Sequence, residues 1–449
     1  MNEVVNQGVS LSKKEASAII AAMRDGAVPR LGVQYIMVGR HREVEAIDNL
    51  LDRISDGESS LKLWIGDFGS GKSFMLTTAR IMAHNRNFVV ADIQFGAKVR
   101  LHSTGGHAQK LYQELVKSIS IKTKPDKNAL QTLIEIWLEQ VQNKVAEEKG
   151  VDSYGLMETE GGFEAMNAQI KNVICSIEGV GDRNFATVLM KYYEGWAKGD
   201  ELLIENAMRW LNGDYSDKRD AKRDLGVTEI INDDNYLKYL MLLSQLFVLA
   251  GYSGFVINMD ECYSLYQIVG TARQSNYDVI RNLYDLCAEN KVSNVLINLA
   301  GTRAFLLDRK KGLYSYGALK TRIELNPYAT EDMVDYRQPV FMLGQLSYEA
   351  VSVLCEKLLY VFNAAGETQI ALTLDEVEEF LNECKAENYT TFREVIKSFI
   401  YILDLMVQHP GSGFVELCRK ELKGIKKIKD SHGDASGGEL AETSEVEEV

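Results

Sequence analysis

The feature of this sequence that most constrains its fold is a glycine-rich loop near residue 70, Gly66-Asp67-Phe68-Gly69-Ser70-Gly71-Lys72-Ser73. The loop matches the phosphate-binding pattern G-x-x-x-x-G-K-[ST] at every fixed position, and it lies between a β-type run at 61–65 and a helical pattern at 74–83. Glycines let the backbone amides converge on phosphate oxygens, and the helix that opens at Phe74 adds a favourable dipole. The pattern therefore predicts an α/β P-loop domain that binds nucleotide through residues 66–74.

Two side chains of this loop have defined roles in that prediction. Lys72 is expected to reach the β- and γ-phosphates of ATP, and the Ser73 hydroxyl is expected to ligate Mg²⁺. A glycine-rich turn that arose by chance is the structural alternative, but the flanking strand and helix argue against it. ATP and Mg²⁺ are therefore the predicted ligands.

A pair of carboxylates, Asp260 and Glu261, ends another apolar β-type run far downstream. We expect this strand to lie beside the strand that leads into the loop, so that Asp260 can hold Mg²⁺ and Glu261 can act as general base on the attacking water. A surface Asp-Glu dipeptide is the structural alternative. Asn258 is a polar residue within this otherwise apolar strand, which departs slightly from the usual pattern.

The order of these patterns indicates how the chain is organised. Short β-favouring runs at 61–65, 88–95, 255–259 and 294–300 predict a largely parallel sheet, because the first two flank a helix in a βαβ arrangement. From residue 98 to 249 the pattern is almost wholly helical, with Gly-rich breaks at 160–162 and 178–181. We interpret this stretch as a helical insertion within the nucleotide domain.

Five regions follow from this organisation. Residues 1–34 are an N-terminal helical segment, in which Ser12 and Glu15 are spaced to form a capping box for a helix over 11–24. Residues 35–97 and 250–330 are the nucleotide-binding core, and residues 98–249 are the insertion. Residues 331–429 are a C-terminal helical lid, with helical patterns at 347–362, 375–382 and 391–407, and the acidic tail at 430–449 is expected to be disordered.

Composition narrows the class of protein. Of the 449 residues, 46% are hydrophobic and 25% are charged, and no apolar run approaches the ~18–20 residues of a membrane helix. Six scattered cysteines without a CxxC pair fit a reducing compartment, so we expect a cytoplasmic protein. The net charge of −14 argues against broad electrostatic capture of nucleic acid, although a local basic groove stays open.

Several motifs resemble those of AAA+ ATPases related to the origin-recognition and STAND groups. Val38-Gly39-Arg40 stands ahead of an amphipathic helix and the P-loop, where that group contacts the base and ribose, and this implies that Gly39 and Arg40 bind nucleotide. The strand end at 299–303 resembles the sensor 1 region, with Thr302 as the first choice for the sensor and Arg303 as the second. Strand alternation directs Asn298 elsewhere.

Two further arginines extend the resemblance. Segment 318–323 is similar to the one that supplies a trans-acting arginine finger, which implies that Arg322 stabilises γ-phosphate charge in a neighbouring subunit and that the chain forms a homo-oligomer. Segment 390–396 is similar to the sensor 2 helix of the lid, which implies a γ-phosphate contact for Arg393. That group commonly has a proline before this arginine, where this chain has Phe392.

A narrower resemblance rests on segments 207–214, 225–227 and 250–255. Together with the motifs above, they are similar to the BREX-type ATP-binding protein family, bacterial ATPases associated with phage-defence islands. The resemblance implies an ATPase in a multi-protein antiviral defence system, with other defence-system proteins as partners, DNA left open as a partner and no membrane.

Competing functions remain open at this level. The first is ATP hydrolysis coupled to conformational change, and the second is a nucleotide-gated scaffold with little turnover that holds a protein partner through its insertion. A DNA-loaded ring motor is the third. A small-molecule kinase is the least favoured, because no motif indicates an acceptor pocket.

Three other features have ordinary structural interpretations. The tryptophans at 64, 137, 196 and 210 are expected to be core anchors rather than base-stacking platforms. The mixed-sign run at 216–224 is expected to be a solvated helix face, and the basic stretch at 419–429 a solvated terminal helix.

Overall fold

The structure is a computed structural model that describes residues 11–153, 155–177, 181–326, 335, 337–366, 369–386 and 391–431, with the side chains of 157 and 423–431 left aside. The chain divides into two compact units, one formed by His41–Gly344 and the other by Met1–Arg40 with Gln345–Val449. The predicted disordered tail at 430–449 lies, from residue 432 on, outside the described residues, as does most of the predicted break at 178–181. The predicted domain boundaries stay a prediction.

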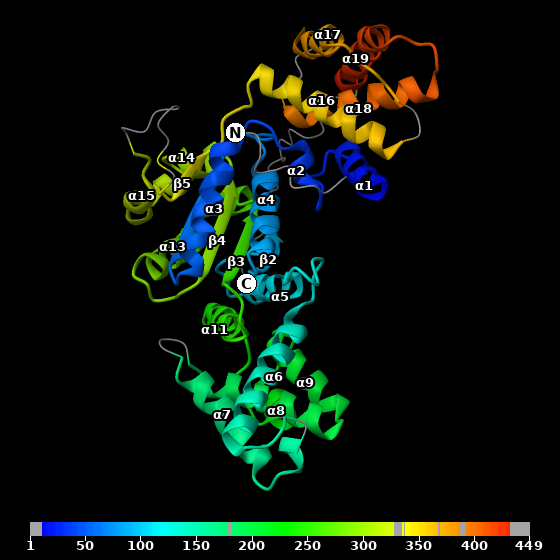
Figure 1. Ribbon diagram of the computed structural model, residues 1–449. Helices are drawn as coiled ribbons and strands as arrows, with labels where there is room; N and C mark the ends of the chain where they lie inside the picture. The colour runs from blue at the N-terminus through cyan, green and yellow to red at the C-terminus, as the bar shows by residue number, and fades with distance from the viewer. Residues whose placement is uncertain are drawn as a thin grey trace. The chain divides into compact units, whose positions relative to one another are not determined.

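The larger unit is built on a five-stranded sheet in the order β2-β3-β4-β1-β5 (Figure 1). The strands are β1 (Ser59–Ile65), β2 (Val89–Gln94), β3 (Phe255–Asp260), β4 (Val295–Gly301) and β5 (Val340–Met342). Every pairing between neighbouring strands is parallel. The predicted α/β P-loop fold with a parallel sheet is therefore confirmed.

One expectation about this sheet was wrong. The acidic strand β3 does not lie beside β1, because β4 is hydrogen-bonded between them. The sequence pattern also missed β5, a strand of three residues at the edge of the sheet. Apolar runs show which segments are strands, but strand order depends on crossover connections that periodicity does not contain.

Helices α3 (His41–Ser55) and α4 (Lys72–Asn85) cover one face of the sheet (Figure 1). Apolar residues of α3 recur at helical spacing, and Ile47, Leu50 and Leu51 pack with Met75 and other residues of α4. This packing matters for the site because α4 begins at the P-loop lysine.

The opposite face packs against α5 (His107–Ser118), α11 (Tyr236–Leu249) and α13 (Gly270–Ala288). The same apolar core continues without a break into the insertion, and Figure 1 shows α6, α7, α8 and α9 grouped beyond α11. The insertion contains α6 (Leu130–Lys149), η1 (Gly155–Glu158), α7 (Gly162–Cys175), α8 (Arg183–Lys198), α9 (Glu201–Leu211) and α10 (Lys218–Leu225). Its predicted helical character is confirmed.

Two polar side chains attach the beginning and end of the insertion to the sheet unit. Asp233 accepts hydrogen bonds from the backbone amides of Gly106, Ala108 and Gln109, and so caps α5 from a segment distant in sequence. Asn276 on α13 is fully buried and bonds both the amide and the carbonyl of His102. The loop after β2 is thereby held from two sides.

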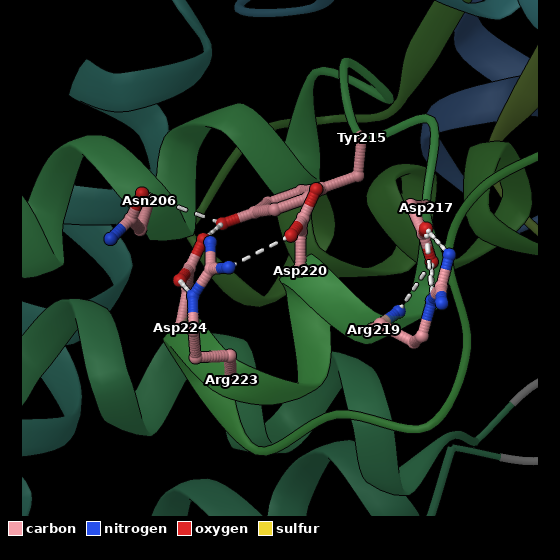
Figure 2. A network of polar contacts seen from close by, with 7 residues as sticks. All are labelled: Asn206, Tyr215, Asp217, Arg219, Asp220, Arg223 and Asp224. Atoms are coloured by element: carbon pink, nitrogen blue, oxygen red, sulfur yellow. Dashed lines mark hydrogen bonds and ion pairs between the residues drawn. The ribbon is translucent and has the colours of Figure 1, made fainter.

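The mixed-sign run forms α10 and is solvated, as predicted. Its arginines pair with aspartates of the same run, and their side chains are 90% and 70% exposed. Figure 2 shows this network, which comprises Asn206, Tyr215, Asp217, Arg219, Asp220, Arg223 and Asp224. The buried ring of Tyr215 donates its hydroxyl to Asp224, so the network fastens the loop before α10 to the helix. These cations are occupied by neighbouring carboxylates.

Three of the four tryptophans are core anchors, as predicted. Trp64, Trp137 and Trp210 are at most 2% exposed. The expectation was wrong for Trp196, which is 54% exposed near the end of α8 and rests on Tyr193 with ring centroids 5.9 Å apart. The helical pattern did not distinguish the outer side of the last turn from its inner side.

Short elements complete the larger unit: α12 (Tyr263–Tyr266), α14 (Arg303–Leu307), η2 (Leu313–Ser315) and α15 (Gly317–Ile323). The smaller unit contains α1 (Lys13–Arg24), α2 (Val33–Ile36), α16 (Tyr348–Ala365), α17 (Leu374–Ala386), α18 (Phe392–Gln408) and α19 (Phe414–Ser431). The predicted capping box between Ser12 and Glu15 is confirmed, and Arg24 of α1 makes a two-pronged ion pair with Asp404 of α18. The N-terminal helix thus belongs to the same unit as the C-terminal helices. Within the described residues, no helix combines the length and the apolar character that a membrane span requires.

Candidate nucleotide-binding site

The P-loop connects the end of β1 to the start of α4. Gly69 and Gly71 have φ angles of 78° and 90°, a region that residues with a Cβ rarely adopt. A Cβ on Gly66 would lie 2.8 Å from the carbonyl oxygen of Leu343, so only glycine fits there without displacing backbone. The glycines of the motif are therefore required by the path of the chain.

Lys72 is the first residue of α4, and its ammonium group rests on the loop itself. Nζ donates to the carbonyl oxygens of Gly66 at 2.9 Å and Asp67 at 2.8 Å. It also lies 5.7 Å from the ring centroid of Phe68, whose side chain is 61% exposed at the rim of the loop. An incoming phosphate would have to take the ammonium group from these carbonyls.

The observation that ties the loop to the acidic strand is a single hydrogen bond. Ser73 Oγ donates to Asp260 Oδ2 at 2.5 Å, although the two residues are 187 positions apart. Asp260 ends β3 and is only 8% exposed. A hydroxyl and a carboxylate oxygen side by side are ligands that Mg²⁺ prefers. The donor set therefore fits the predicted metal, with Ser73 and Asp260 as the residues that would hold it.

Glu261 has an unusual backbone. Its φ angle is 57°, a left-handed conformation that is uncommon for a residue other than glycine, and its amide donates to Asp260 Oδ1 at 2.8 Å. The next amide, that of Cys262, donates to the carbonyl of Ala300 on β4 at 2.9 Å. This turn leaves the Glu261 side chain exposed next to the buried Asp260. Backbone strain of this kind is concentrated at functional sites.

The two candidates for sensor 1 differ in what their side chains contact. The Thr302 hydroxyl caps α14 by accepting a hydrogen bond from the amide of Phe305 at 3.2 Å, and the residue is 7% exposed. Arg303 instead extends to the P-loop, where its Nε lies 3.2 Å from Asp67 Oδ2. The structure thus brings Arg303, the second choice, into contact with the loop.

Arg322 is held within its own chain. Its guanidinium donates to both carboxylate oxygens of Asp285 on α13, at 2.5 and 3.0 Å, and to the carbonyl of Ala318 at 2.6 Å. The side chain is 31% exposed. The inferred role as an arginine finger stays a prediction, and it requires the contact with Asp285 to open.

Gly39, Arg40 and Arg393 belong to the smaller unit. Gly39 has a φ angle of 66°, and a Cβ there would lie 2.9 Å from a methyl group of Leu346. Arg40 is 8% exposed, whereas Arg393 is exposed in the first turn of α18. The nucleotide contacts inferred for these three residues stay predictions.

Sequence reasoning missed the partners of the polar residues in the sheet. Trp64 Nε1 donates to Asn298 Oδ1, Asn298 Nδ2 donates to Asn258 Oδ1, and Asn258 Nδ2 donates to Asp92 Oδ1, at 3.0, 2.9 and 2.8 Å. This row crosses four strands beneath α4. Asparagines in two apolar strands were the available signal, because buried amides require partners.

Comparison with known families gives one match. The model of the family described as BREX system ATP-binding protein BrxC/D matches residues 11–421. Comparison with the curated proteins and with the solved structures gives no match.

Proposed function

Because the chain belongs to the BREX system ATP-binding protein BrxC/D family, we propose that it hydrolyses ATP and uses the reaction to drive conformational change in a multi-protein assembly. The family makes it an ATP-binding protein of the BREX system, in agreement with the resemblance inferred from the sequence. Hydrolysis, Mg²⁺, phage defence, action on DNA and assembly into a homo-oligomer belong to the proposal.

The contact between Ser73 and Asp260 is the observation that carries this proposal. It joins a complete phosphate-binding loop to a buried carboxylate, and an exposed carboxylate, Glu261, follows directly. Bound Mg²⁺ would neutralise charge on the β- and γ-phosphates. A hydrolytic P-loop site needs these parts together with a group that activates water.

In the proposed reaction, a water oxygen attacks the γ-phosphorus of ATP and Glu261 accepts a proton from that water. The bond between the γ-phosphorus and the bridging oxygen breaks, which gives ADP and inorganic phosphate. Lys72 leaves the carbonyls of the loop to bind the β- and γ-phosphates, and the loop amides hold the phosphate oxygens.

Steady-state ATPase activity of the full chain with Mg²⁺ tests the proposal. Glu261→Gln is expected to lower kcat by about 10²–10⁴-fold, because it removes the general base. Lys72→Ala is expected to abolish nucleotide binding, whereas Glu205→Gln, an exposed carboxyl on α9, serves as the matched control. The proposal is refuted if Glu261→Gln hydrolyses ATP as fast as the wild type.

A second experiment separates a trans-acting role of Arg322 from a structural one. If Arg322 acts on a neighbouring subunit, Asp285→Asn should free it and raise turnover, while Arg322→Ala should lower turnover by about 10³-fold or more. If the pair only stabilises the fold, both variants should lower stability with similar activity per folded molecule. Turnover per chain that rises with protein concentration would support the oligomer.

A specific contact also favours the alternative of a nucleotide-gated scaffold with little turnover. Because Asp285 holds Arg322 in the single chain, the isolated protein lacks a free arginine at this position. Tight ATP binding without turnover at any protein concentration would support that alternative, with the insertion as the surface that holds a partner.

A further inference from the structure

The rim of the P-loop contains an ion pair that the proposed reaction does not use. It joins Asp67, the second residue of the loop, to Arg303, the first residue of α14. The side chains are 56% and 46% exposed, so both are accessible to solvent. Because β1 and β4 are paired and Ile65 is in register with Gly301, the two residues follow neighbouring strand ends.

Residue 67 contacts both of the cations that lie at the loop. Its carboxylate holds Arg303, and its backbone carbonyl accepts a hydrogen bond from Lys72 Nζ at 2.8 Å. A phosphate that takes Lys72 away from the loop would therefore arrive directly beside Arg303. The neighbouring Thr302 hydroxyl is instead committed to the cap of α14.

We propose that Arg303 recognises the γ-phosphate of ATP and that Asp67 holds Arg303 while that phosphate is absent. This inference rests on the proposed function, since it assigns the residue that distinguishes ATP from ADP at the same site. Arg303 is then a specificity-determining residue, and Asp67 is a positioning residue that acts through it.

The strengths of the two contacts make this exchange favourable. An ion pair between half-exposed side chains is weak, because water screens both charges. A guanidinium binds phosphate through parallel charge-assisted hydrogen bonds, which are stronger than ordinary ones. ATP can therefore displace Asp67 from Arg303, whereas ADP, which has no γ-phosphate, leaves the pair closed.

Nucleotide affinity measured by calorimetry with Mg²⁺ tests the inference. The probes are ADP and a non-hydrolysable ATP analogue, and the quantity of interest is the ratio of their affinities. Arg303→Gln is expected to lower the preference for the ATP analogue by about tenfold or more, because a charge-assisted contact is lost. Arg309→Gln removes an exposed arginine from the loop after α14 and is the matched control.

Asp67→Asn tests the positioning role and is combined with Arg303→Gln in a double-mutant cycle. Freed from its partner, Arg303 should raise the preference for the ATP analogue by about two- to fivefold, in line with a weak exposed pair. In the Arg303→Gln background the same change should leave the ratio unaltered, since no arginine remains to be released. A purely structural role for Asp67 would not produce this dependence.

The outcomes separate this inference from the proposed function. Wild-type protein that binds neither nucleotide overturns both. Wild-type protein that binds ATP through Lys72, with an affinity ratio unchanged in Arg303→Gln or reduced in Thr302→Val instead, overturns this inference alone. An equal effect of Asp67→Asn in both backgrounds also overturns it, because simple repulsion of phosphate would then explain the change.

Discussion

Replacing Lys62 by methionine is expected to remove a pH-dependent component of stability between pH 8 and 10.5. Lys62 lies on β1, is 2% exposed, and donates from Nζ to the carbonyls of Arg337 at 2.9 Å and Gln338 at 2.7 Å. Burial lowers the pKa of Lys62 to about 8 from an ordinary value of 10.5; repulsion by Arg53 adds to this effect and attraction by Asp335 opposes it.

The sign and the size of the effect follow from proton binding. Below pH 8 the lysine is charged in both states, so the folded protein bears the full cost of the buried charge. Between pH 8 and 10.5 the folded state releases this proton while the unfolded state keeps it, so the free energy of unfolding rises with pH. Since a tenfold change in proton affinity corresponds to about 1.4 kcal/mol, the rise attributable to Lys62 is about 3 kcal/mol.

Urea unfolding followed by intrinsic fluorescence at a series of pH values measures this component. The wild type minus Lys62→Met difference cancels the tyrosines and other groups that titrate in the same range. The methionine also leaves two carbonyls without their donor, but that cost is a constant offset and does not change the slope. Lys122→Met, at an exposed position, should give a flat difference. A flat difference for Lys62→Met as well would refute the reasoning.

Two further predictions concern buried polar contacts. Asn298→Leu leaves Trp64 Nε1 and Asn258 Oδ1 without partners, and should lower the free energy of unfolding by about 2–5 kcal/mol in the same urea assay; a loss under about 1 kcal/mol would contradict the importance of the row. Asp233→Ala removes the acceptor of three amides at the start of α5, and should destabilise by about 1–3 kcal/mol and speed amide hydrogen exchange there; unchanged exchange would argue that water caps the helix equally well.

Much of the candidate site was predictable because its parts are local in sequence. The loop at 66–73, the acid pair at 260–261 and the helix that starts at Lys72 each depend on residues within one turn or strand. What could not be predicted was which of them meet. The contacts of Arg303 with Asp67 and of Arg322 with Asp285 join residues far apart in the chain, and a sequence pattern has no term for them.

The sequence by itself determined the class of fold, the positions of most strands and helices, and the identity of the phosphate-binding loop. These depend on short-range periodicity, caps and glycine conformations, which neighbouring residues specify. The tertiary structure decided the strand order, which separates β1 from β3 by β4 yet brings Ser73 within 2.5 Å of Asp260. It also decided that Thr302 caps a helix while Arg303 reaches the loop. Such pairings are selected by the packing of both sheet faces at once, and that packing exists only when the whole chain has folded.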